Sequence, residues 1–223
     1  MLTGKGIITP EQKTLIRAFA RLADSEQFYL TGGTALAEFY FGHRRSYDLD
    51  FFTSVSDLVI PFSRGLELGL KDAGITARPI RRLHSFAEFV CTIDGRETRL
   101  QLAHDSPYRF APPEPGEYGV LVNDYQDIVV DKLLAFYGRW THRDAVDIYF
   151  ILEKENLEDL LARAKEKDPG FDLYWLSVAL KHVEEFPDTF AEWDVSMVSP
   201  FDAREAKRRL LSLSDKILDD LVR

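Results

Sequence analysis

Apolar residues recur along the first half of the chain with two different periods, which predicts a mixture of helices and strands. A threonine cap followed by Pro10 and a one-sided apolar stripe predict a first helix that ends near Leu22. The residues before Pro10 are expected to be frayed. The short apolar run 28–30 then predicts a strand, which passes through Gly32-Gly33 into a helical segment at 35–40.

The alternation of polar and apolar residues continues beyond this strand–turn–helix unit. Residues 47–52 alternate as a half-buried strand does. Asp94-Gly95 separates two further alternating runs, 86–93 and 98–103, and is a strong signal for a hairpin turn. Helical spacing at 61–74 predicts a helix that closes at a glycine, and the prolines and glycines of 107–119 predict a loop.

From Tyr125 onward the strand signal fades and a period of about 3.6 residues dominates. Five helices are predicted there, at 125–139, 142–153, 156–167, 170–183 and 201–221. We therefore predict an α+β fold, with a mixed-sheet core in residues 1–122 and a helical C-terminal region in residues 123–223.

The composition is that of a folded globular protein, since 45% of the residues are apolar and 13% are aromatic. Cys91 is the one cysteine, so no intramolecular disulfide can form, and we expect an inert core thiol. The sequence does not begin with a charged segment followed by an apolar one, and no apolar run approaches the roughly 20 residues that cross a bilayer. We therefore expect a cytoplasmic protein without a membrane partner.

The formal net charge of −9 argues against non-specific coating of nucleic acid, which normally requires a basic protein. Short basic clusters occur nevertheless, and a solvated surface charge is the simplest interpretation of each. The clusters are 43–45, Arg78 with 81–82, Arg96 with Arg99, and 207–209.

Two neighbouring features could carry chemistry. Gly32-Gly33 would present backbone N–H groups at the start of a helix, where a phosphate can bind, although alone the pair is more simply a structural turn. Asp48 and Asp50 are two residues apart on a predicted strand, so both carboxylates project from one face while Leu49 points into the core. Paired carboxylates suit Mg²⁺ or Mn²⁺, although two solvated acids on an exposed edge strand are the alternative.

A third group of charges lies in the segment 131–147. Lys132 and Arg139 are seven residues apart and share a helical face. Thr141 is expected to cap the next helix, with Asp144 reaching back as in a capping box. Arg143, Asp144 and Asp147 then crowd the first turns of that helix. Cations here could steady a triphosphate, or the group could be an ordinary salt-bridge network.

These segments together resemble the AbiEii/AbiGii toxin family of nucleotidyltransferases. The family pattern of Gly-Gly-Thr-Ala-Leu, Arg-x-Ser and Asp-x-Asp is present as GGTALAEFYFGHRRSYDLDFF, with Arg44 and Ser46 in register. A second family block, a lysine helix followed by Arg-Asp-x-x-Asp, matches the segment from Lys132 to Asp147. The matches span roughly residues 28–152.

The resemblance implies a polymerase-β-like core that uses Mg²⁺ (or Mn²⁺) and a nucleoside triphosphate. It further implies transfer of a nucleoside monophosphate to an acceptor such as a tRNA end, and restraint of the activity by an antitoxin protein. Asp48 and Asp50 would hold the metal, and these two aspartates and Lys132 would be catalytic. The implied nucleotide contacts are Gly32, Gly33, Thr34, Arg44, Ser46, Lys132, Arg139, Arg143, Asp144 and Asp147.

One position departs from the pattern of this core, which usually has a third carboxylate on a later strand. Gln101 occupies that position, and a neutral amide is not a general base. Glu97 or Asp105 could replace it only with a shift of register. A catalytically degenerate nucleotide-binding interaction module is therefore an alternative to the enzyme, and a transferase that modifies proteins is another.

Overall fold

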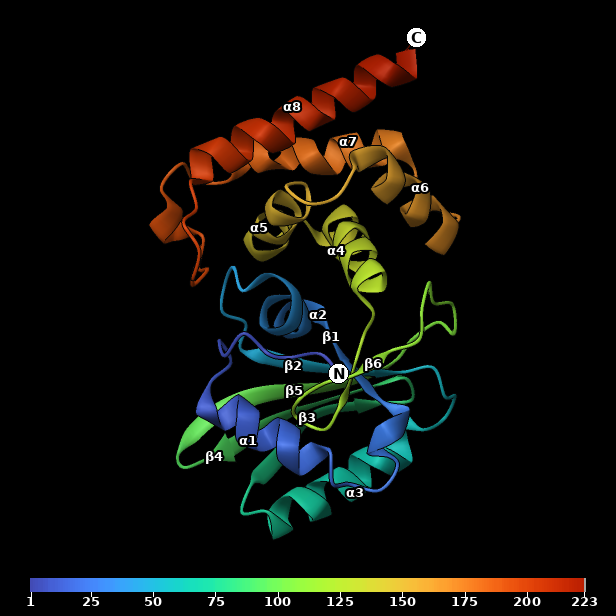
Figure 1. Cartoon of the computed structure of the whole chain (residues 1–223), viewed down its shortest axis with the longest axis vertical. Helices are drawn as coiled ribbons and strands as arrows, with labels where there is room; N and C mark the ends of the chain where they lie inside the picture. The colour runs from blue at the N-terminus through green and yellow to red at the C-terminus, as the bar shows by residue number, and fades with distance from the viewer. Residues whose placement is uncertain (223) are drawn as a thin grey trace. The chain divides into compact units, whose positions relative to one another are not determined.

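The computed structural model describes residues 1–222, which form two compact units, Met1–Tyr125 and the residues from Gln126 onward (Figure 1). The first unit contains a seven-stranded sheet with helices, and the described part of the second unit is helical. This confirms the predicted α+β fold.

The sheet of the first unit has the strand order β3-β4-β5-β2-β1-β7-β6. The strands are β1 (Tyr29–Thr31), β2 (Asp48–Thr53), β3 (Thr76–Leu83), β4 (Phe86–Ile93), β5 (Arg96–His104), β6 (Glu114–Pro115) and β7 (Leu121–Val122). The central strand β2 pairs antiparallel with β1 and parallel with β5. The hairpin predicted at Asp94-Gly95 joins β4 to β5, and Ile93 pairs with Arg96 beside the turn.

Two helices cover one face of this sheet, α1 (Pro10–Phe19) and α3 (Val59–Asp72). Their aromatic residues form a shared core with β2. The ring of Phe19 stacks on that of Phe51 with 3.8 Å between centroids, and Phe62 of α3 lies 5.2 Å from Phe19. The remaining helical segments of this unit are η1 (Ser25–Gln27), α2 (Gly32–Ala35) and the π-helical η2 (Leu36–Phe41).

The N-terminal segment is held against the unit, so the expectation that it frays is wrong. The cause is Glu38 of η2, a fully buried carboxylate that the sequence pattern did not single out. Its oxygens accept hydrogen bonds from the backbone N–H groups of Gly6 and Ile7, at 3.0 and 2.8 Å. The hydroxyl of Tyr118 donates to the same carboxylate at 2.5 Å.

Strand β3 was not predicted from the sequence. It forms one edge of the sheet and is exposed along most of its length, so it lacks the alternation of apolar residues that marks a half-buried strand. Its pairing with β4 shifts register between Pro79 and Arg81. A proline is tolerated there because edge strands and bulges leave a backbone N–H unused.

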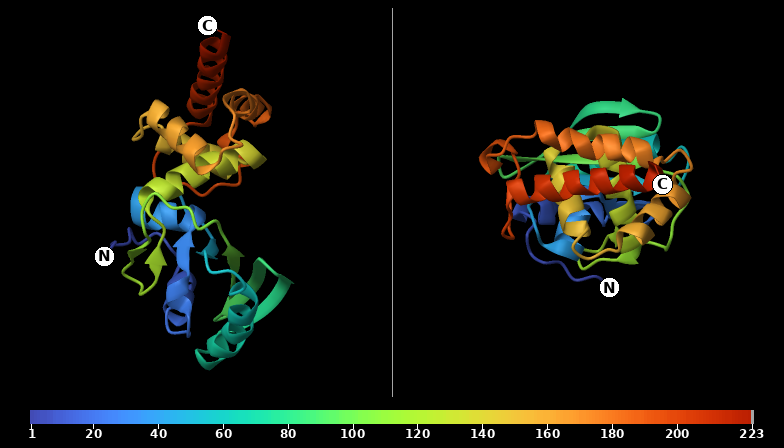
Figure 2. Two further views of the ribbon diagram at one scale, coloured as in Figure 1. Left: turned by 90° about the vertical axis from the view of Figure 1, so that its right-hand side faces the viewer. Right: turned by 90° about the horizontal axis from the view of Figure 1, so that it is seen from above.

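The five helices predicted from Tyr125 onward are present; the first has the predicted bounds, and the bounds of the other four differ by one to three residues. They are α4 (Tyr125–Arg139), α5 (His142–Ile151), α6 (Leu157–Lys167), α7 (Leu173–Lys181) and α8 (Ala203–Val222), with η3 (His182–Glu185) and η4 (Phe190–Glu192) between the last two. Helices α7 and α8 pack along each other (Figure 2). None of the helices in residues 1–222 combines the length and apolar content needed to span a bilayer.

The basic cluster at 207–209 has a structural role within the second unit. Lys207 Nζ donates to the carbonyl of Phe186 at 2.5 Å and to Asp188 at 2.7 Å, which fixes the loop after η3. The guanidinium of Arg209 donates to the carbonyl of Leu152 at 2.5 Å. Two of the three cations in this cluster, Lys207 and Arg209, therefore stabilise the fold, and no ligand is needed to explain them.

Candidate active site

Asp48 and Asp50 lie on β2 as the alternation predicts. Leu49 and Phe51 are fully buried, while the two aspartates are half-buried on the opposite face of the strand. Two carboxylates therefore share one face of a central strand, rather than an exposed edge strand, which excludes the alternative of two acids on a sheet edge.

The glycine turn lies directly against this pair. Gly32 has a φ of +69°, and a Cβ on it would overlap the carboxylate of Asp50. A Cβ on Gly33 would lie 2.7 Å from Nη2 of Arg44 and 2.9 Å from Oγ of Ser46. Glycine is required at both positions because carboxylate, guanidinium and hydroxyl groups approach the backbone closely.

The surrounding residues hold this arrangement in place. Thr34 is buried, and its hydroxyl donates to the backbone carbonyl of Asp48 at 2.5 Å. A phosphate contact by Thr34 would thus involve its backbone N–H. Gln12 of α1 donates to the carbonyl of Ser46 at 2.8 Å, and Asn123 donates to the hydroxyl of Thr31 at 3.1 Å.

Gln101 lies directly opposite Asp50 on the neighbouring strand β5. Its side-chain amide donates to Oε1 of Glu88 at 3.3 Å, and Glu88 pairs directly with Gln101 across β4 and β5. Glu88 also lies 3.4 Å from the guanidinium of Arg99 and 3.5 Å from that of Arg81. A carboxylate therefore exists on this face of the sheet, but it is one strand farther from the aspartates than the expected third acid.

Glu88 was missed in the sequence analysis, although a signal for it was available. A two-residue hairpin turn at Asp94-Gly95 fixes the register of β4 against β5. Counting back from the pair Ile93–Arg96 brings Glu88 opposite Gln101.

The two substitutes considered for the third acid lie elsewhere. Asp105 follows the end of β5 and accepts hydrogen bonds from the hydroxyl of Tyr29 at 2.8 Å and from Arg109 at 3.2 Å. Glu97 lies four residues before Gln101, at the exposed start of β5. Neither occupies the position opposite Asp50.

In the second unit, the charged residues of the Lys132–Asp147 segment form a salt-bridge network. Lys132 Nζ lies 2.7 Å from Asp147 and 3.4 Å from Asp144, and all three side chains are buried. Arg139 binds both oxygens of Asp144, at 2.8 and 3.2 Å. Burial acts to raise the pKa of Asp144, but the charge of Lys132 and the hydrogen bonds from Arg139 and Thr141 lower it overall.

The predicted helix cap is confirmed in part. The hydroxyl of Thr141 accepts a hydrogen bond from the backbone N–H of Asp144, as expected for a cap of α5. The reciprocal half of a capping box is not formed, because the carboxylate of Asp144 is bonded to the Thr141 hydroxyl, Arg139 and Lys132 instead. Arg143 is exposed on α5.

Two aspartates alone are too few ligands to hold a divalent ion. The pair suits an ion that is also bound by the phosphates of a substrate. Within residues 1–222, no three His, Cys, Asp or Glu side chains gather into a metal cluster. Asp48 and Asp50 supply hard oxygen ligands, and the close approach of Asp50 to Gly32 brings one of them beside the backbone that would bind a phosphate. Phosphate oxygens and water would complete the coordination.

Comparisons with known proteins find the same fold elsewhere. MenT4, a nucleotidyltransferase toxin from Mycobacterium tuberculosis, has a similar structure with a TM-score of 0.61, at 14% identity and covering 94% of this chain and 82% of that one. The crystal structure of JHP933 from Helicobacter pylori gives a TM-score of 0.58 at 19% identity, covering 94% and 90% of the two chains. An uncharacterised protein of Aquifex aeolicus is 26% identical over 185 residues, which are 82% of this chain and 84% of the relative.

These solved structures share the fold of the chain, and one of them is a nucleotidyltransferase toxin. More narrowly, residues 14–101 match the family model of the nucleotidyl transferase AbiEii toxin of type IV toxin–antitoxin systems. This match confirms the resemblance drawn from the sequence and supports transferase activity. It includes the glycine turn, both aspartates and Gln101.

Proposed function

We propose that the protein is a metal-dependent nucleotidyltransferase that moves a nucleoside monophosphate from a nucleoside triphosphate to an acceptor, with a tRNA end as the first candidate. In this reaction an acceptor oxygen forms a bond to the α-phosphorus, the bond to pyrophosphate breaks, and pyrophosphate leaves. The observation that carries the proposal is the convergence of Asp50, Arg44 and Ser46 on the two glycines of one turn.

Each group in this convergence has a role that suits the reaction. The backbone N–H groups of Gly32 and Gly33 would bind phosphate oxygens, and Arg44 would add a cation beside them. Asp48 and Asp50 would hold Mg²⁺ or Mn²⁺, which when bound neutralises triphosphate charge and polarises the α-phosphorus. Gln101 has no basic atom, so the acceptor proton would pass to water or to a base other than Gln101.

The charged segment of the second unit receives its role from the family resemblance and from its own geometry. Lys132 is buried between Asp144 and Asp147, which favours a positioning role over a direct phosphate contact. Arg139 and Arg143 are exposed, and we assign the direct phosphate contacts of this segment to them. The toxin–antitoxin name of the family model supports the further proposal that a second protein restrains the activity.

A pyrophosphate-release assay tests the proposal without knowledge of the base. The wild-type protein is incubated with the four triphosphates, total tRNA and Mg²⁺ or Mn²⁺, beside Asp50→Asn. We expect acceptor-dependent release from the wild type and loss of at least about 100-fold in Asp50→Asn, since the variant lacks a ligand charge. Equal release from both proteins would contradict the assignment of Asp50.

A second candidate function is that of a binding module whose chemistry has been lost. The observation that favours it is Gln101, whose amide lies opposite Asp50 where a third carboxylate is expected and is bonded to Glu88. Metal-dependent binding of a triphosphate without pyrophosphate release in any condition would support this candidate over the enzyme.

A further inference from the structure

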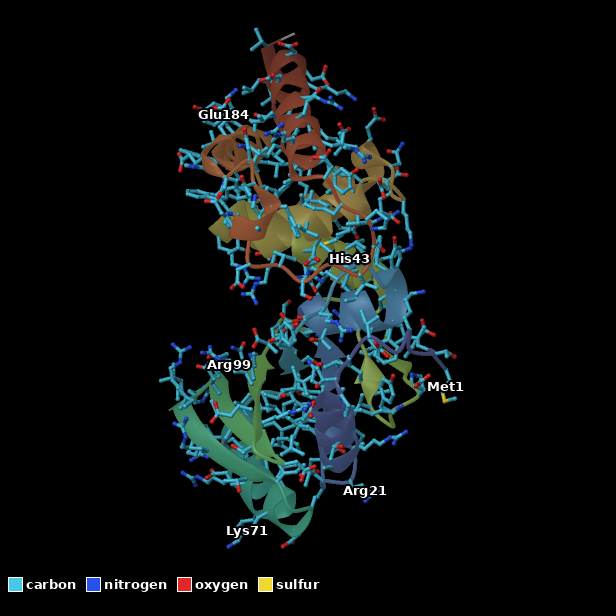
Figure 3. The ribbon with its side chains drawn as sticks, turned by 90° about the vertical axis from the view of Figure 1, so that its left-hand side faces the viewer. Met1, Arg21, His43, Lys71, Arg99 and Glu184 are labelled. Carbon is cyan, nitrogen blue, oxygen red and sulfur yellow. The ribbon has the colours of Figure 1, made fainter. Side chains whose placement is uncertain are left out.

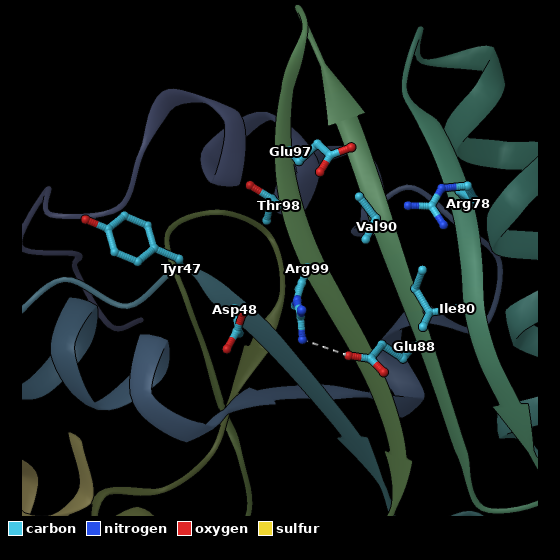
Figure 4. A pocket seen from close by; sticks show the side chains of 9 residues that line it. All are labelled: Tyr47, Asp48, Arg78, Ile80, Glu88, Val90, Glu97, Thr98 and Arg99. Atoms are coloured by element: carbon cyan, nitrogen blue, oxygen red, sulfur yellow. Dashed lines mark hydrogen bonds and ion pairs between the residues drawn. The ribbon is translucent and has the colours of Figure 1, made fainter. Parts of the chain in front are cut away.

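A cavity of about 500 Å³ adjoins Asp48 on the first unit (Figure 4). Its walls come from the start of β2 and from β3, β4 and β5. The lining residues are Tyr47, Asp48, Arg78, Ile80, Glu88, Val90, Glu97, Thr98 and Arg99. A volume of this size is within the range of small-ligand sites and can hold one nucleotide.

Two arginines give the cavity its cationic groups. Within residues 1–222, the guanidinium of Arg78 on β3 has no hydrogen-bond or ion-pair partner, although its backbone is paired with Val90 of β4. The side chain of Arg99, which is labelled in Figure 3, is 62% exposed and forms an ion pair with Glu88 at 3.4 Å. The neighbouring Arg96 is engaged outside the cavity, with Glu11 at 2.8 Å.

The lining also contains three carboxylates, those of Asp48, Glu88 and Glu97. Glu88 lies within ion-pair distance of both Arg81 and Arg99, so its charge is offset by two guanidinium groups. Asp48 belongs to the pair that is proposed to hold the metal ion. Glu97 is the one further carboxylate in the lining, at the exposed start of β5.

Two exposed apolar side chains lie at the same cavity. Tyr47 is 54% exposed and Ile80 is 49% exposed, so both are accessible to a ligand in the cavity. An aromatic ring beside cations is the usual arrangement for stacking a base while its phosphate is held. Tyr47 directly precedes β2, beside Asp48, and Ile80 lies on β3 (Figure 4).

We propose that this cavity binds the acceptor, through one terminal nucleotide unit whose phosphate contacts Arg78 and Arg99 and whose base packs on Tyr47. The acceptor hydroxyl then lies at the Asp48 end of the cavity. This inference rests on the proposed transferase function and adds the site and the residues that bind the acceptor. The same chemistry is offered by the 3′ end of a nucleic acid strand and by a free nucleotide.

The test is direct binding without triphosphate or metal, so it does not depend on transfer. A fluorescein-labelled 12-nucleotide single-stranded RNA with a free 3′ hydroxyl is titrated by anisotropy at several salt concentrations, with unlabelled CMP as competitor. The variants are Arg78→Gln with Arg99→Gln, and Tyr47→Ala. Arg96→Gln is the matched control, because it lies on β5, is 73% exposed and removes one charge outside the cavity.

We expect the double arginine variant to bind RNA at least tenfold more weakly, and Tyr47→Ala about tenfold more weakly, while Arg96→Gln stays within twofold. The slope of log affinity against log salt should fall by about 0.7, which corresponds to the loss of one phosphate contact to a single strand. Competition by CMP at a similar affinity would support a free nucleotide as the acceptor, and failure to compete would support a strand.

The inference is overturned if the cavity variants bind both ligands as the Arg96→Gln control does. Arginine-dependent binding combined with no transfer of any nucleotide would contradict the proposed function and leave the binding site standing. Transfer with an unchanged KM for the acceptor in the arginine variants would support the proposed function and contradict the binding site.

Discussion

Gly32→Ala tests whether the close approach of Asp50 to the glycine turn matters for function. The left-handed φ of +69° costs an L-residue about 1–2 kcal/mol of stability. In addition, the new Cβ would overlap the Asp50 carboxylate, so the turn or the carboxylate must move. A displacement of about 1 Å at a reacting centre lowers a rate by about 100-fold, and we expect the rate of pyrophosphate release to fall by that order.

Gly95→Ala is the matched control because it separates backbone strain from the clash. Gly95 has a φ of +78°, and a Cβ there would meet nothing within 4 Å. Backbone strain should cost both variants about 1–2 kcal/mol of unfolding free energy, measured by circular dichroism during denaturation. Only Gly32→Ala should also lose pyrophosphate release and Mn²⁺ affinity. Full activity in Gly32→Ala, or an equal loss in Gly95→Ala, would refute the reasoning.

Three further predictions concern the remaining polar groups. Gln101→Glu adds a carboxylate opposite Asp50, so Mn²⁺ should bind more tightly by calorimetry and the rate should rise by at least about tenfold; unchanged metal affinity would contradict this. Lys132→Met leaves two buried carboxylates without their shared cation and should cost about 3–5 kcal/mol of unfolding free energy. Lys181→Met, which breaks an exposed pair, should leave the unfolding free energy nearly unchanged. The pKa of Asp144 is lower in the folded protein than its ordinary value of 3.8, so its contribution to stability is present above that pH and is lost as the pH falls through the lower folded value. The difference in unfolding free energy between wild type and Asp144→Asn should therefore shrink below about pH 4, and a difference that stays constant with pH would be the contrary result.

The last two measurements have a convenient spectroscopic readout. All three tryptophans, Trp140, Trp175 and Trp193, belong to the second unit. Their fluorescence therefore follows the unfolding of the helical unit, in which Lys132 and Asp144 lie.

The parts of the site that the sequence predicted are those that short-range patterns determine. The alternation around Asp48 and Asp50 predicted that the two carboxylates lie on one face of the strand, because side chains alternate between faces and Leu49 and Phe51 are buried on the other. The glycine turn was predicted in the same way, but its contact with Asp50 was not, since it depends on the pairing of Thr31 with Asp50 across two strands.

The parts that were missed depend on contacts between distant residues. Strand β3 contains Pro79 and several arginines, and it is a strand because β4 provides hydrogen bonds along its length. The cavity beside Asp48 exists because β3, β4 and β5 bring Arg78 and Arg99 to one face. In the sequence these two arginines had appeared as separate surface clusters.

The central claim is tested most directly by incubating the protein with each α-labelled nucleoside triphosphate, Mg²⁺ or Mn²⁺, and total tRNA, beside an Asp48→Ala/Asp50→Ala control. The account predicts label on RNA with the intact aspartate pair and none with the control. Label on protein instead would assign a protein-modifying transferase. No label on either, with triphosphate binding retained, would contradict the enzyme and leave a nucleotide-binding module.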